Sequence, residues 1–158
     1  KNKVNSLPNV VFIDSGESLS SYDLISRSKF VMVYNSSIGL EASLMGKPVL
    51  CAGRARYTQI PTVFFHQSKD AYLAEFENFL DAEVIHPPDE FRSNARKFLY
   101  FQLYRTSLPF KDYLTAHPMP GFVLFKEFSW EALKPENSTT MRVIAEGILN
   151  GGSFLLDE

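Results

Sequence analysis

The chain has 158 residues, of which 45% are hydrophobic, and its formal net charge is −2. This length is enough for one domain with a sizeable core. The charge gives no basis for binding nucleic acid in bulk, and no apolar run is long enough for a membrane-spanning helix. We therefore expect a soluble, cytoplasmic protein that does not bind nucleic acid.

The single cysteine, Cys51, has no partner for an internal disulfide. It lies in the apolar run PVLCAG, which predicts a small buried side chain in a reducing compartment rather than a nucleophile. The three histidines stand apart in the sequence, so we expect no metal site. The chain begins at Lys1, close to its first apolar run, and we expect it to be a fragment of a longer polypeptide.

The first half of the chain alternates short apolar runs with short helical patterns. Helices are predicted over Ser20–Ser28, where Leu24 and Ile25 face inward, and over Ile38–Met45. Apolar strands that alternate with helices are typical of a parallel sheet covered on both faces. About four strands are predicted: Val10–Ile13, Phe30–Tyr34, Pro48–Ala52 and Thr62–His66. The fold class is therefore α/β, with a partial Rossmann-like parallel sheet flanked by helices.

The second half has a mostly helical pattern that extends this domain. Phe122–Phe125 is an apolar run whose type the pattern leaves open. The helix that begins at Asp89 carries aromatic residues on nearly every face, which predicts contact with a second surface such as another domain or a membrane interface. Ordinary packing is the alternative. The helices are predicted over Ser68 to about Leu80, Asp89 to about Ser107, and Asn137 or Ser138 to Asn150.

The stretch YNSSIGLEASLMGKPVLCAG, residues 34–53, places two hydroxyls, a glycine and an acid where a predicted strand gives way to a helix. Ligands of open parallel sheets bind just beyond the carboxyl ends of the strands. Unpaired amides at the helix start and the hydroxyls of Ser36 and Ser37 suit a phosphate. Gly39 would let a ligand approach the backbone, and Glu41 could accept hydrogen bonds from a ribose.

The alternative is that these residues only stabilise the helix. Serine is among the commonest N-caps, and an acid in the first turn complements the helix dipole. The polar loop GRARYTQIP, residues 53–61, also has one functional and one structural interpretation. Arg54 and Arg56 suit phosphate or an acidic sugar, but a solvated loop is equally consistent with them. His66 ends the last predicted strand, where a lone histidine is more often structural.

Residues 7–57 resemble the nucleotide-binding segment of GT-B glycosyltransferases, and bacterial capsule polysaccharide biosynthesis proteins in particular. The shared pattern is a strand, Asn-Ser-Ser, Gly-Leu-Glu-Ala, Gly-Lys-Pro-Val and a Gly-x-x-x-Tyr loop. The residues that carry it are Asn35, Ser36, Ser37, Gly39, Leu40, Glu41, Ala42, Gly46, Lys47, Pro48, Val49, Gly53 and Tyr57.

The resemblance implies two Rossmann-like domains that face each other across a cleft. Residues 1–67 would be part of the C-terminal, donor-binding domain, and residues 68–158 its helical remainder and extension. Ser36, Ser37 and Gly39 would hold the donor phosphate, and Glu41 would contact ribose or base. The expected substrate-binding residues are Asn35, Ser36, Ser37, Gly39, Glu41, Arg54, Arg56 and Tyr57.

The implied function is the transfer of a sugar from a nucleotide donor in bacterial surface polysaccharide synthesis. The nucleotide-sugar is a substrate, and no cofactor is expected. The other partners would be a saccharide or lipid-linked acceptor and a missing N-terminal domain, with peripheral association at the inner face of the membrane. We name no catalytic residue, because the general base of an inverting enzyme would come from the other domain, and we expect the isolated fragment to be inactive. A non-hydrolysing nucleotide-sugar 2-epimerase and a non-catalytic interaction domain remain alternatives.

Overall fold

The computed structural model describes residues 7–14 and 16–157. The chain forms two compact units, Lys1–Ser93 and Asn94–Glu158. The expected division into a donor-binding part, residues 1–67, and its helical remainder and extension, residues 68–158, stays a prediction. In the described part of the first unit, a parallel sheet has the order β1-β2-β3. Its strands are β1 (Val31–Val33), β2 (Val49–Cys51) and β3 (Phe64–Phe65). The α/β fold class is confirmed.

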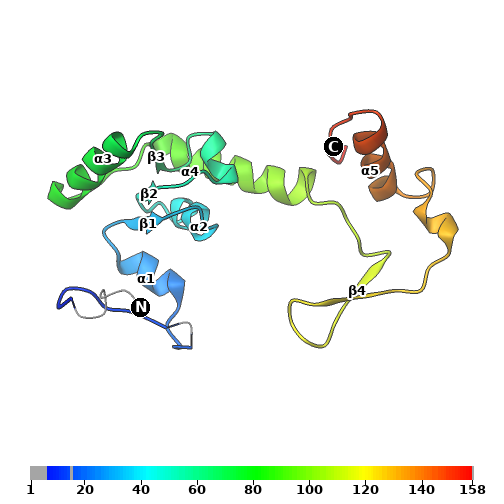
Figure 1. The fold of residues 1–158 in the computed structure, drawn as a ribbon, viewed down its shortest axis with the longest axis horizontal. Coiled ribbons are helices and arrows are strands. Elements are labelled where there is room, and N and C mark those ends of the chain that lie inside the picture. Colours follow the sequence, from blue (N-terminus) through cyan, green and yellow to red (C-terminus); the bar gives the residue numbers. More distant parts are fainter. Residues whose placement is uncertain (1–6, 15, 158) are drawn as a thin grey trace. The chain divides into compact units, whose positions relative to one another are not determined.

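The sheet is covered on both faces, which explains why its strands are apolar throughout. All three residues of the central strand β2 are buried. Figure 1 shows helices on the two sides of the sheet. On one side, the rings of Phe30 and Phe64 each contact Phe79 edge to face, with centroids 5.1 Å and 5.0 Å away. The helices of the first unit are α1 (Ser21–Arg27), α2 (Ile38–Leu44) and α3 (Lys69–Asp81), and α4 (Asp89–Tyr100) begins in this unit and continues into the second one.

The helix boundaries follow the capping signals in the sequence. The Ser20 side chain accepts a hydrogen bond from the Tyr22 amide at the start of α1, and Ser68 accepts one from the Ala71 amide at the start of α3. Gly46, with φ of 80°, takes the left-handed conformation that ends α2. The predicted helices in this unit are therefore confirmed.

Two expectations for the first unit are wrong. Val10–Ile13 is not a strand, because no neighbouring strand pairs with it in the described residues and the side chains of Val11 and Phe12 are 85% and 63% exposed. A high β propensity does not form a strand without a partner. In α1, only Ile25 is buried, whereas Leu24 is exposed.

The second unit contains helices and a hairpin. Strands β4 (Leu114–Ala116) and β5 (Val123–Phe125) pair antiparallel, so the apolar run left open by the sequence is a strand. The long predicted helix continues from α4 as a π-helical segment, η3 (Phe101–Arg105). A short 3-10 helix, η4 (Trp130–Leu133), precedes α5 (Thr139–Leu149), whose N-cap is Ser138, one of the two residues that the sequence offered.

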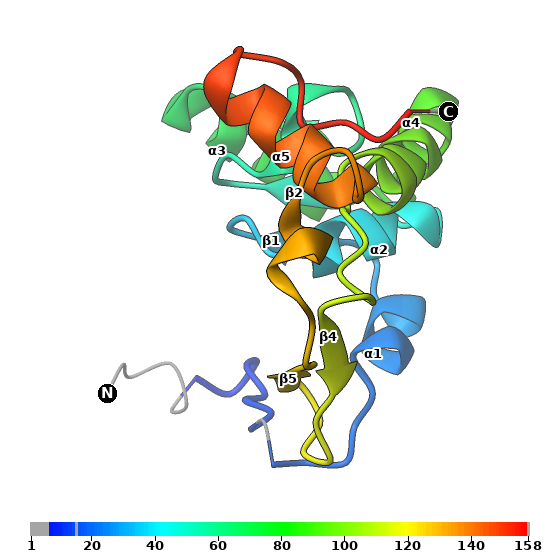
Figure 2. The ribbon, with the colours of Figure 1, turned by 90° about the vertical axis from the view of Figure 1, so that its right-hand side faces the viewer.

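The C-terminal tail of the second unit returns along α5 (Figure 2). The Leu156 amide donates to the Arg105 carbonyl at 2.8 Å, and the Arg105 Nε donates to the Leu156 carbonyl at 2.9 Å. Many apolar side chains of this unit remain exposed, including Tyr104 and all three residues of β5. The predicted contact of the aromatic helix from Asp89 with a second surface stays a prediction. None of the helices in the described residues is both long and apolar enough to cross a membrane.

Candidate functional site

The segments that follow β1 and β2 lie side by side at the carboxyl edge of the sheet. The Gly53 amide donates to the Tyr34 carbonyl at 2.6 Å, which extends the pairing of the two strands by one step. The Tyr57 hydroxyl then donates to the Ser36 carbonyl at 2.7 Å. The serine segment (residues 34–37) and the arginine loop (residues 53–61) are thus joined into one structure. This is expected for segments that leave neighbouring parallel strands.

Tyr57 is the centre of this structure rather than an exposed contact residue, because only 4% of it is exposed. A Cβ atom on Gly39 would lie 2.5 Å from the Tyr57 hydroxyl and 2.9 Å from the Cγ2 atom of Val33. The missing side chain at Gly39 therefore makes room for Tyr57, while the approach of a ligand to the Gly39 backbone stays a prediction. The pattern places a glycine and a tyrosine far apart in the sequence, and the fold shows that they form one packing unit.

The serines present their hydroxyls at the surface, although the helix start differs from expectation. The Gly39 and Leu40 amides already donate to the carbonyls of Ser36 and Ser37, so they are not free for an anion. The Ser37 side chain makes no capping hydrogen bond, and the Ser36 Oγ accepts only a long one, 3.4 Å, from the Ile38 amide. Capping therefore uses little of the hydrogen-bonding capacity of the two exposed serine hydroxyls. Since α2 has only 7 residues, we expect the serine hydroxyls to contribute more to binding an anion than the helix dipole does.

Glu41 has a partner that the sequence did not suggest. The Tyr22 hydroxyl, from the first turn of α1, donates a hydrogen bond to the Glu41 carboxylate. This bond and the negative charge of Glu41 raise the pKa of Tyr22, so the hydroxyl keeps its proton. No local signal predicts this pair, because the two residues belong to different helices and meet only after those helices pack.

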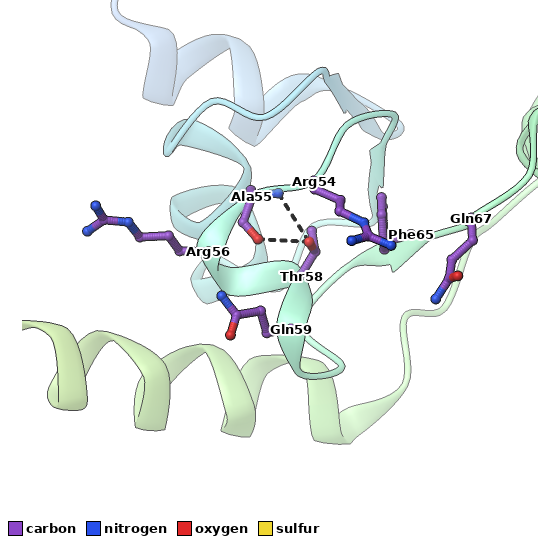
Figure 3. Close-up of a pocket in the computed structure, with 7 residues that line it drawn as sticks. All are labelled: Arg54, Ala55, Arg56, Thr58, Gln59, Phe65 and Gln67. Atoms are coloured by element: carbon purple, nitrogen blue, oxygen red, sulfur yellow. Dashed lines mark hydrogen bonds between the residues drawn. The ribbon is translucent and has the colours of Figure 1, made fainter. Parts of the chain in front are cut away.

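Arg54 and Arg56 line an open pocket of about 620 Å³ beside the first turn of η2 (Arg56–Gln59). Figure 3 shows the two guanidinium groups leaving the loop in opposite directions. Amide side chains contribute to the same pocket, so it offers several hydrogen-bond donors to an anionic or sugar ligand. Neither Ser36 nor Ser37 lines this pocket. Its lining residues are Arg54, Ala55, Arg56, Thr58, Gln59, Phe65 and Gln67.

The arginine loop is held by hydrogen bonds to its own backbone. The Ala55 amide donates to the Thr58 Oγ1 at 3.1 Å, and that hydroxyl donates to the Ala55 carbonyl at 2.8 Å (Figure 3). The buried Thr62 hydroxyl donates to the Tyr57 carbonyl at 2.7 Å. These bonds fix the backbone from which both arginine side chains extend, and a fixed backbone reduces the ordering cost of binding a ligand.

Cys51 is buried below this site, as the sequence predicts. Its thiol lies 3.2 Å from the carbonyl oxygens of Tyr34 and Gly53. Burial raises the pKa of the Cys51 thiol, and burial together with Cys51 raises that of Tyr57, so both groups stay protonated near neutral pH. The His66 Nε2 faces α3 and lies 3.7 Å from a Glu75 carboxylate oxygen. The part of the chain that is described holds no group of three potential metal ligands.

A parallel sheet with polar loops at its carboxyl edge is the arrangement of ligand-binding α/β proteins. The family model of capsule polysaccharide biosynthesis proteins matches residues 5–99, more than half of the chain. The chain therefore belongs to the capsule polysaccharide biosynthesis protein family, which supports a role in capsule synthesis. No curated protein and no solved structure matches it.

Proposed function

We propose that this chain binds the nucleotide-sugar donor of a GT-B glycosyltransferase that acts in capsule polysaccharide synthesis. Membership of the capsule polysaccharide biosynthesis family supports the process. The parallel sheet supports the domain type, because GT-B donors bind at the carboxyl edge of a Rossmann-like sheet.

One observation carries the proposal: the bond between the Tyr57 hydroxyl and the Ser36 carbonyl joins the serine segment to the arginine loop. The exposed serines and the two arginines then extend from neighbouring loops of one edge, whose backbones this bond joins. Hydroxyls and guanidinium groups are complementary to the oxygens of a diphosphate. A purely structural serine cap would not require a buried tyrosine to connect it to a cationic loop.

The expected binding residues then take different roles. Asn35, Ser36 and Ser37 are exposed and contact the donor directly. Arg54 and Arg56 bind its phosphate or sugar from the pocket beside η2. Glu41 accepts hydrogen bonds from the ribose. Gly39 and Tyr57 shape the site from below, since both are buried.

Catalysis in this account needs a second Rossmann-like domain. It would supply the opposite wall of the cleft and the general base of an inverting reaction. The acceptor is a saccharide or a lipid-linked saccharide, which places the reaction at the inner face of the membrane. This chain would provide donor affinity and orientation but no turnover by itself.

A turnover assay on the full-length protein tests this function. Release of nucleotide from UDP-, GDP- and CMP-linked sugars is followed with and without a capsule-type oligosaccharide acceptor. The proposal predicts release that depends on the acceptor and falls at least tenfold in Arg54→Ala, a loss of one charge-assisted contact. Conversion of the donor sugar without any acceptor would instead identify an epimerase. Absence of turnover and of nucleotide binding would favour an interaction domain.

A further inference from the structure

We infer that Tyr22 is a positioning residue that holds the Glu41 carboxylate for a ribose, so that the site selects donors carrying a ribose 2′-hydroxyl. The inference rests on the proposed function, because it concerns the same donor site. It adds a residue that the sequence pattern does not contain and restricts the class of nucleotide that binds.

The fold brings Tyr22 to the binding edge of the sheet. The Lys47 ammonium donates to the carbonyl of Ser28, just after α1, at 3.1 Å, and Lys47 lies just before β2. The end of α1 is therefore at the amino edge of the sheet. Its first turn, which contains Tyr22, lies at the other end of the helix, beside the Glu41 side chain that its hydroxyl contacts.

The hydrogen bond leaves Glu41 able to bind a ligand. Tyr22 donates to the Oε2 atom of the carboxylate, and an ionised carboxylate can accept about four hydrogen bonds. The other oxygen can thus accept from a ribose hydroxyl. A free glutamate side chain would lose rotamer entropy on binding, whereas Tyr22 has already restricted this one.

The Tyr22 side chain is suited to this role at neutral pH. Its hydroxyl is protonated and can only donate to the ionised Glu41, since the bond to Glu41 and its charge raise the pKa of Tyr22. Tyr22 is also 54% exposed, which means that it is not held in place by burial in the core. Removing its hydroxyl should therefore change the site without unfolding the domain.

The test is the ratio of affinities for a ribonucleotide and its 2′-deoxy form, measured calorimetrically on the full-length protein with UDP, GDP and CMP. For the nucleotide that binds, the wild type should prefer the ribose form about tenfold, the value of one hydrogen bond to a charged group. Glu41→Gln should lower this ratio to about twofold, and Tyr22→Phe to about threefold. Tyr100→Phe, which removes an exposed hydroxyl of α4, is the matched control and should leave the ratio unchanged.

The outcomes separate the inference from the proposed function. Binding of a nucleotide with an unchanged ratio in Tyr22→Phe would overturn the inference but leave the donor site intact. Equal loss of affinity for both forms would also overturn it, because that result indicates a structural contact only. If none of the six nucleotides binds the wild type, the proposed function fails and the inference fails with it.

Discussion

The Tyr57 hydroxyl donates a hydrogen bond of 2.7 Å to the Ser36 carbonyl, and it does so from a buried ring. The same carbonyl accepts a bond of 3.1 Å from the Gly39 amide. One oxygen atom therefore connects the end of β1, the start of α2 and the loop after β2. The shape of the candidate site depends on this contact.

Replacement of Tyr57 by phenylalanine should destabilise the first unit by about 1–2 kcal/mol, because the ring still packs but the bond to Ser36 is lost. Urea denaturation measures the change in the free energy of unfolding. Tyr100→Phe, an exposed tyrosine, should cost less than about 0.5 kcal/mol. Equal costs for both variants would show that the Tyr57 hydroxyl contributes nothing to the fold.

Gly39→Ala should cost about 1–3 kcal/mol, because its Cβ would lie 2.5 Å from the Tyr57 hydroxyl in a packed interior. The cost should fall in a Tyr57→Phe background, where the closest atom is gone and the tight contacts that stay are with Val33 Cγ2 at 2.9 Å and the ring Cζ of residue 57 at 3.3 Å. Gly16→Ala is the control, since a Cβ there meets nothing within 4 Å. Strictly additive effects of the two substitutions would contradict the contact between Gly39 and Tyr57.

The stability of the protein should decline in alkaline solution. Below about pH 10 both the folded and the unfolded states keep the Tyr57 proton, so the contribution of this hydroxyl to the free energy of unfolding is fully present. Above that pH the unfolded chain releases the proton while the buried hydroxyl retains it, so the unfolded state binds fewer protons and the free energy of unfolding falls by up to about 1.4 kcal/mol per pH unit.

Urea denaturation between pH 9 and about pH 11 measures this slope. Tyr57→Phe should show a shallower decline than the wild type. Cys51, Tyr22 and Tyr72, whose pKa values are also raised, contribute to the decline in both proteins. Parallel curves would mean that Tyr57 ionises as easily in the folded state as in the unfolded one.

Cys51 should react with a thiol reagent at least about a hundredfold more slowly in the native protein than in urea, because its sulfur is buried and its pKa is raised by that burial. The rate of colour release from an aromatic disulfide reagent measures it. Since Cys51 is the single cysteine of the sequence, the signal has one source. Fast labelling of the folded protein would contradict the packing of β2.

Much of the first unit could be predicted from local signals. Ser20, Ser68 and Gly46 mark helix ends because caps act on the adjacent backbone. The apolar run around Leu50 is also a local signal, because a strand that is apolar on both faces is typical of the buried middle of a parallel sheet. Val10–Ile13 has similar local preferences but no partner strand in the described residues, and pairing is a tertiary property that no short run contains.

The composition of the candidate site was less predictable than its location. The serines and arginines stand directly after strands, so the sequence places them at one edge. The contacts between Tyr22 and Glu41 and between Tyr57 and Gly39 join residues 19 and 18 positions apart. Such pairs depend on how helices pack, so the sequence did not indicate which hydroxyl holds Glu41 or what fills the space at Gly39.

Calorimetric titration of the full-length protein with UDP, GDP and CMP, in the wild type and in Ser36→Ala and Ser37→Ala, tests the donor site most directly. The account predicts that one nucleotide binds and that each substitution weakens it about tenfold, with melting temperatures nearly unchanged. Ser138→Ala, which removes the N-cap of α5, should instead lower the melting temperature and leave the affinity unchanged. Unchanged nucleotide affinity in both site variants, with lowered stability, would show that the two serines only stabilise α2.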